Sequence, residues 1–176
     1  MLTVTRLLPQ GRGLATTLIR HAPTLDLDWD MRQKSRQQAT DSVGRTLNIF
    51  LTPGSVLRGG DVLVAEDGSQ ILVVAAPQVV LRIKPCAEHG CDLDLARAAY
   101  HLGNRHVPVE LHSDYLQIEP DPVLADMLRS MHLVVTELMT AFEPEGGAYG
   151  GGHGTGRHGA HSHMHGHGHD HTHHHG

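Results

Sequence analysis

The sequence predicts an α+β fold in three parts: two small domains over residues 1–76 and 77–149, and a tail over residues 150–176. Short apolar runs separated by turn residues fill the first part and predict strands. In the second part, two helical patterns interrupt the strand patterns. The third part is almost entirely histidine and glycine, and we expect it to be disordered because it has little apolar surface to bury.

The first part is predicted to be a small all-β domain. LDLDW alternates with period two and places Leu25, Leu27 and Trp29 on one face of a strand. A charged bridge follows, and further strand patterns come at 46–51, 61–65 and 70–76. The pairs Pro53-Gly54, Gly59-Gly60 and Asp67-Gly68 supply turn chemistry between them, and Asp-Gly is a strong hairpin signal. No amphipathic helix competes convincingly.

The second part is predicted to be a ferredoxin-like domain, because its elements run in the order β-α-β-β-α-β. Helical spacing covers Asp92–Leu102, with Gly103 expected as the glycine that ends this helix. Asp121 is expected to cap the second helix, with Pro122 at its first position. The predicted strands are residues 79–83, 107–111, 115–118 and 133–142.

Composition excludes several classes of function. The net charge is −5 and no basic stripe occurs, so we expect no nucleic-acid partner. No apolar stretch approaches the roughly 18 residues of a membrane span, and the first residues do not resemble a signal peptide. Two cysteines argue against a disulfide framework and favour a cytoplasmic location. No known catalytic motif occurs, so the protein is not expected to be an enzyme.

The tail is the most obvious metal-binding region, because it carries eleven of the seventeen histidines. Imidazole binds Ni(II), Cu(II) and Zn(II) at neutral pH, so the tail should bind such ions with high capacity and little selectivity. An expression tag is usually one unbroken hexahistidine run, whereas at most three histidines adjoin here, and we interpret the tail as native. The predicted tail ligands are His153, His158, His161, His163, His165, His167, His169, His171, His173, His174 and His175.

Two further candidates lie in the folded part. His106 follows a predicted helix end and precedes a strand, so it should project from an ordered edge. One imidazole is a poor metal site, but a two-fold axis would bring its copy alongside. The segment CAEHGC offers Cys86, His89 and Cys91, although their spacing matches neither a C-x-x-C pair nor a zinc finger. Two surface cysteines that bind nothing are the alternative interpretation of this segment.

Several motifs occur in one order along nearly the whole chain. The more specific are LGNRHVP (102–108) and FEPEGGAY (142–149), the latter followed by the His-rich tail. The others are RQKSR (32–36) with Asp41 and Gly44, then LTPGSVLRGGDVLVAEDG and DPVLADMLRSM. Together these residues resemble the urease accessory protein UreE family.

The resemblance implies a nickel metallochaperone with an N-terminal β domain of the partner- or peptide-binding type and a ferredoxin-like, metal-binding C-terminal domain. It implies a homodimer through the C-terminal domains, in which His106 of both subunits holds one Ni(II) and a tail histidine, with His153 nearest, completes the site. Zn(II) and Cu(II) are expected to compete for the same ligands. The implied partners are the urease accessory GTPase (UreG) and the urease apoprotein assembly complex.

One departure limits the resemblance. Some relatives carry a further pair of histidines where this chain has Glu119, Pro120, Asp121 and Pro122, so a second folded site of that kind is not implied.

Two other functions stay open from the sequence alone. One is nickel or zinc storage or detoxification, acting mainly through the tail. The other is an interaction scaffold with incidental metal binding.

Overall fold

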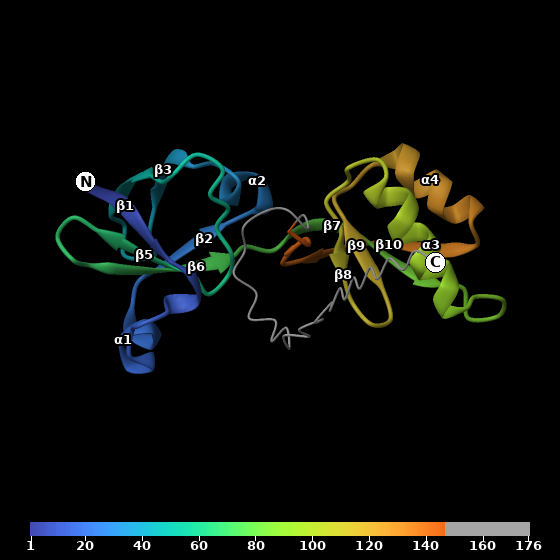
Figure 1. The fold of residues 1–176 in the computed structure, drawn as a ribbon, viewed down its shortest axis with the longest axis horizontal. Coiled ribbons are helices and arrows are strands. Elements are labelled where there is room, and N and C mark those ends of the chain that lie inside the picture. Colours follow the sequence, from blue (N-terminus) through green and yellow to red (C-terminus); the bar gives the residue numbers. More distant parts are fainter. Residues whose placement is uncertain (147–176) are drawn as a thin grey trace, which may run out of the picture. The chain divides into compact units, whose positions relative to one another are not determined.

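The structure is a computed structural model that describes residues 1–146, apart from the side chain of Asp92. Met1–Glu145 form one compact unit, which contains two β-sheets, a six-stranded and a four-stranded one (Figure 1). The fold is thus α+β with more strand than helix. Within this described part, no helix is long and apolar enough to cross a membrane. The predicted tail, residues 150–176, lies outside the described residues.

The first sheet has the strand order β2-β6-β5-β1-β4-β3. Its strands are β1 (Leu2–Leu8), β2 (Thr24–Leu27), β3 (Arg36–Thr40), β4 (Thr46–Phe50), β5 (Val62–Ala65) and β6 (Gln70–Ala75). Two neighbouring pairs, β1 with β4 and β2 with β6, are parallel, and the other pairs are antiparallel. The predicted Asp67-Gly68 hairpin is confirmed, because it joins β5 to β6 with Gly68 at a φ of 83°.

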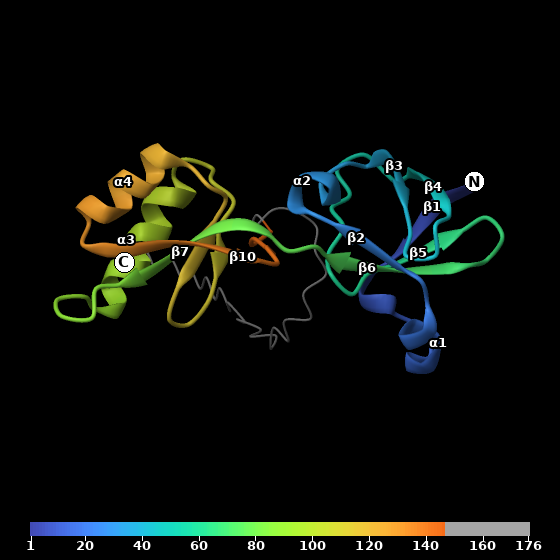
Figure 2. The ribbon, with the colours of Figure 1, turned by 180° about the vertical axis from the view of Figure 1, so that it is seen from behind.

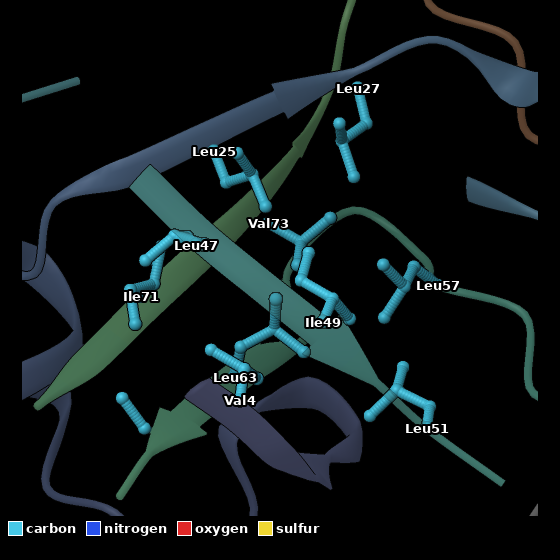
Figure 3. Packing of buried hydrophobic residues seen from close by; sticks show 11 residues of the cluster. Val4, Leu25, Leu27, Leu47, Ile49, Leu51, Leu57, Leu63, Ile71 and Val73 are labelled. Carbon is cyan, nitrogen blue, oxygen red and sulfur yellow. The ribbon is translucent and has the colours of Figure 1, made fainter. Parts of the chain in front are cut away.

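Aliphatic side chains from these strands, together with Leu51 and Leu57 from the segment between β4 and β5, form the core of the first sheet, with no aromatic ring among them. Figure 3 shows the labelled side chains from different strands converging on one interior. Leu25 and Leu27 are both buried, as the alternation of LDLDW predicts. The buried members are Val4, Leu25, Leu27, Leu47, Ile49, Leu51, Leu57, Leu63, Ala65, Ile71 and Val73.

The first sheet also differs from the all-β prediction, because short helices connect its strands. They are η1 (Pro9–Gly11), α1 (Thr16–His21) and α2 (Trp29–Arg32). Helix α2 starts where a strand was expected, because the Asp28 carboxylate accepts a hydrogen bond from the Met31 amide at 2.8 Å and caps the turn.

Strand β3 lies inside the charged bridge, where no strand was predicted. It is an edge strand of alternating exposure, so its polar sequence carries no apolar signal.

The second sheet has the order β10-β7-β9-β8, and all its neighbouring strands are antiparallel. Its elements are β7 (Gln78–Pro85), α3 (Asp92–Gly103), β8 (Glu110–Leu111), β9 (Leu116–Ile118), α4 (Pro122–Ser130) and β10 (Leu133–Thr140). This is the predicted β-α-β-β-α-β order. Figure 1 shows α3 and α4 on the same side of this sheet, and Figure 2 shows β7 and β10 side by side from behind. The predicted cap of α4 is confirmed, since Asp121 accepts from the Leu124 amide at 2.9 Å.

Candidate metal site

The chain leaves α3 through a turn that ends at His106, which has a φ of 57°. The His106 amide donates to the Gly103 carbonyl at 2.9 Å, and the Val107 amide donates to the Leu102 carbonyl at 3.2 Å. These two bonds form a Schellman motif with His106 in the left-handed position that glycine usually occupies. The prediction that Gly103 has this role is wrong, because Gly103 lies inside α3 and is not in a left-handed conformation.

The backbone of this turn is fixed, whereas the imidazole of His106 is not used by the fold. Val107 and Val109 pack with the core of the second sheet, so the chain beyond the turn is anchored. His106 itself is exposed, and within residues 1–146 its imidazole makes no hydrogen bond, ion pair or ring contact. A non-glycine residue in this conformation costs about 1 kcal/mol or more, and such residues cluster at functional sites.

One chain does not assemble a complete metal site in its described part. Among residues 1–146, no group of three or more His, Cys, Asp or Glu side chains is arranged to hold a metal ion. In the described part of the chain, His106 therefore contributes a single imidazole. The eleven predicted tail ligands, from His153 to His175, lie outside the described residues.

The loop before α3 does not gather Cys86, His89 and Cys91 into such a group either. Both cysteines are free thiols, Cys91 is exposed, and the His89 ring lies 3.9 Å from Glu88. Cys91 starts α3, and its amide donates to the Asp94 carboxylate at 2.8 Å. This hydrogen bond lowers the pKa of Asp94. The backbone of Cys91 thus supports the helix start, and a ligand role for its thiol stays a prediction.

The segment Phe142–Glu145 is held by several hydrogen bonds to the rest of the described chain. The Glu143 carboxylate accepts hydrogen bonds from Arg32 at 2.7 Å, from the Gly59 amide at 2.8 Å and from Arg58 at 3.3 Å. Arg32 also donates to the Phe142 carbonyl, and Arg58 donates to the Pro144 carbonyl at 2.6 Å. We call these four residues the 142–145 segment.

Apolar and charged contacts reinforce this segment. The Phe142 ring is fully buried edge-on against Trp29, with centroids 6.1 Å apart, and Val80 completes the cluster. Arg32 is also fully buried. Burial lowers the pKa of its guanidinium and the Glu143 carboxylate opposes that effect, so the cation stays charged. The sequence marked Arg32 and FEPEGGAY only as shared motifs, and the structure shows that they bind each other.

A second histidine in the folded part has a carboxylate partner that the sequence analysis missed. The His112 Nε2 atom lies 2.8 Å from the Glu110 carboxylate, and the imidazole stacks on the Tyr115 ring at 4.1 Å. Glu110 also accepts a hydrogen bond from the Glu143 amide at 2.8 Å. No local signal marked this pair, because His112 follows the end of β8 and lies in the turn between β8 and β9.

These features define a class of protein before any comparison: an α+β protein of two sheets, with an exposed histidine in a left-handed turn and a His-rich extension. Comparison with known families then identifies it. The family model described as "UreE urease accessory protein, N-terminal domain" matches residues 4–76. The family model for the C-terminal domain of the same protein matches residues 78–175. The chain therefore belongs to the UreE urease accessory protein family, which implies an accessory, non-enzymatic role in urease maturation.

Individual relatives agree with the family assignment. The chain is 69% identical over 154 residues to the urease accessory protein UreE of Paracidovorax citrulli, which covers 87% of this chain and 73% of the relative. It is 66% identical over 154 residues to the UreE of Albidiferax ferrireducens, covering 87% and 88% of the two chains. It is 63% identical over 161 residues to the UreE of Verminephrobacter eiseniae, covering 92% and 95%.

Proposed function

We propose that the protein is a cytoplasmic metallochaperone that delivers Ni(II) for assembly of the urease active site. The observation that carries the proposal is the exposed imidazole of His106, held in a costly backbone conformation without a partner inside residues 1–146. Family membership supplies the context of urease maturation. Eleven tail histidines supply capacity for the ion.

The proposed site forms in a homodimer. Residues 77–149 would act as the ferredoxin-like dimerisation domain and residues 1–76 as the partner- or peptide-binding domain, with 150–176 as the metal-binding tail. The strand and helix order of the second sheet supports the ferredoxin-like assignment. Isologous contact of two C-terminal domains would bring both copies of His106 to one Ni(II) ion, and a tail histidine such as His153 would complete its shell.

Transfer would proceed by ligand exchange. Two imidazoles and replaceable tail ligands leave an open N/O shell, from which an ion passes readily to a better-organised acceptor. Protons compete with the metal for the imidazole nitrogen, so the affinity for the ion should fall as the solution becomes more acidic. Zn(II) and Cu(II) would compete at the same ligands. The receiving partners would be UreG and, through it, the urease apoprotein assembly complex.

Calorimetric Ni(II) titration of three proteins tests the proposal: the full chain, the chain truncated after Tyr149, and His106→Ala. The truncation keeps both sheets and their cores, so it should fold. We expect it to retain one tight site per dimer and part of the urease activation, whereas His106→Ala should lose that site. Loss of all activity on truncation would instead favour storage or detoxification through the tail. Unchanged urease activation by His106→Ala would overturn the chaperone proposal and leave a scaffold.

A further inference from the structure

Strand β10 forms one edge of the second sheet and is paired on one side only. Its partner is β7, in one continuous antiparallel register that runs from Leu133 opposite Pro85 to Thr140 opposite Gln78. Alternate residues of such a strand direct their N–H and C=O groups away from the partner strand. Within residues 1–146, these outward groups of β10 make no hydrogen bond. The strand therefore offers a row of backbone donors and acceptors to a further strand.

The other edge strands of the two sheets are short, covered or polar. Strand β8 has only two residues. Strand β2 is covered at Thr24, whose carbonyl accepts from the Ser42 amide at 2.8 Å and whose amide donates to the Ser42 hydroxyl at 2.9 Å. Strand β3 has the polar sequence RQQAT. Each of these features hinders the pairing of an edge strand with a second molecule.

Strand β10 has none of these features. It is eight residues long, contains no lysine, arginine or proline, and pairs with β7 without a bulge. Glu137 is its single charged residue. Two of its large apolar side chains are exposed, Val134 at 49% and Met139 at 63%. A long, regular and partly apolar edge of this kind favours pairing with another strand.

The sequence of β10 is complementary to itself. Two copies can pair antiparallel across a two-fold axis perpendicular to the sheet, so that one residue lies opposite its own copy. An axis at Thr136 or at Glu137 gives the longest overlap of two such strands. An axis at Glu137 would set two carboxylates directly opposite each other, which is destabilising. The register centred on Thr136 is therefore the favoured one.

This register also gives both exposed apolar side chains an apolar partner. It sets Met139 opposite Leu133 on the face that packs against the helices, and Val134 opposite Leu138 on the other face. At the axis, Thr136 lies opposite its own copy, and cross-strand threonine pairs are stabilising. Charge, apolar contact and length thus select the same register.

We propose that two copies of the chain pair through β10 and form one continuous antiparallel sheet, with Thr136 at the two-fold axis. One strand pair is a small contact beside the roughly 1,600 Å² of a standard stable interface, so the association is weak and depends on protein concentration. It needs neither metal nor His106. The proposal therefore goes beyond the proposed function and gives the chain a contact separate from the His106 interface.

Disulfide cross-linking of the full chain in EDTA tests the register. Cys86→Ser and Cys91→Ser remove the native thiols, and one cysteine is then placed in β10. Two copies of Thr136 would have Cα atoms about 4.5–5.5 Å apart, which a disulfide can span, whereas two copies of Met139 would lie about 20 Å apart. With diamide as the oxidant, Thr136→Cys should form covalent dimers at least several-fold faster than Met139→Cys. Met139 is a matched control because it is an exposed residue of the same strand.

Sedimentation velocity of the full chain in EDTA provides an independent measurement. The average mass of the parent protein should rise with protein concentration. Thr136→Lys should shift this rise to several-fold higher concentration, because it sets two ammonium groups opposite each other at the axis. Thr40→Lys is the matched control, since Thr40 is an exposed threonine of the edge strand β3. This control should associate like the parent.

The outcomes separate this inference from the proposed function. Equal cross-linking of Thr136→Cys and Met139→Cys, or equal association of Thr136→Lys and the parent, would overturn the pairing through β10. Faster cross-linking of Glu137→Cys than of Thr136→Cys would overturn the register centred on Thr136. His106→Ala tests the proposed function alone, and it should leave both measurements on β10 unchanged.

Discussion

The 142–145 segment and the His106 turn use their side chains in opposite ways. In the segment, the Glu143 carboxylate accepts three hydrogen bonds and the Phe142 ring is fully buried. In the turn, two backbone hydrogen bonds fix His106, while its imidazole makes no hydrogen bond, ion pair or ring contact within residues 1–146. A side chain that is buried or hydrogen-bonded within the fold has a structural role. A side chain without such interactions, on a residue whose backbone conformation is energetically costly, is a candidate functional residue.

His132 provides an internal control for this comparison. It follows α4, is exposed, and has a φ of 62°, close to the 57° of His106. Unlike His106, it has a charge partner: the Cys91 hydrogen bond lowers the pKa of Asp94, and the charge of His132 adds a smaller effect in the same direction. The left-handed conformation alone therefore does not distinguish a ligand. The absence of a partner in the described residues does.

The largest expected effect is on metal binding. In the chain truncated after Tyr149, His106→Ala should weaken Ni(II) binding by about 100-fold or more, since even outer partners of metal ligands change affinity by about 10- to 100-fold. This corresponds to about 2.8 kcal/mol. Calorimetry measures it, with His132→Ala as the control that should bind like the parent. Equal losses in both variants would remove the distinction between the two turns.

The next effect concerns the 142–145 segment. Glu143→Ala should lower the free energy of unfolding by about 2 kcal/mol, because the fully buried Arg32 loses its carboxylate partner. The estimate is below that for a wholly buried pair because Glu143 is 31% exposed. Urea denaturation measures it. Adding Arg32→Met should restore part of the loss, and Ni(II) affinity at His106 should stay unchanged if the segment is purely structural.

A third substitution, at the His106 turn, should change the free energy of unfolding and Ni(II) binding in opposite directions. His106→Gly should raise the free energy of unfolding by about 1 kcal/mol, because glycine adopts a positive φ without steric cost. His132→Gly should have a similar effect. Thermal unfolding compares the two, and only His106→Gly should also lose Ni(II) binding. A destabilised His106→Gly would mean that the imidazole has a structural contact after all.

The smallest effect is a pH dependence near His132. The Cys91 amide lowers the pKa of Asp94, so this carboxylate stabilises the folded state at pH values above its ordinary pKa of about 3.9. That contribution should disappear as the pH falls through the lowered pKa. Asp94→Asn should therefore narrow the difference in melting temperature between pH 6 and pH 3. An unchanged difference would show that Asp94 does not contribute to stability.

Local sequence patterns predicted most of the second sheet and less of the first. Helical spacing located α3 and α4, and Asp121 with Pro122 marked the start of α4, because capping chemistry depends only on neighbouring residues. Strand β3 was missed because only Ala39 of this edge strand packs against the core, and its other four residues are polar. Helix α2 was missed because Trp29 continues the alternation of LDLDW while Asp28 ends the strand.

In the candidate site, too, local patterns predicted some features and missed others. His106 could be picked out from its place between a helix and a strand, but its left-handed conformation could not, because LGNRH offers the nearby Gly103 as the more obvious helix end. The contacts of Glu143 with Arg32 and of Glu110 with the Glu143 amide join residues 111 and 33 positions apart. Contacts over such separations depend on the folded chain, and no local pattern in one sequence predicts them.

The place of β1 inside the first sheet has a consequence for how the protein is made. This strand, residues 2–8, lies between β4 and β5, so both of its partners are synthesised at least 38 residues after it. The N-terminal strand must therefore wait unpaired on the ribosome until most of the first sheet has emerged, and such non-local pairing is slow. Because β1 is an interior strand, deleting residues 2–8 would not simply remove an edge strand of the sheet. It would divide the sheet into two separate fragments, β2-β6-β5 and β4-β3.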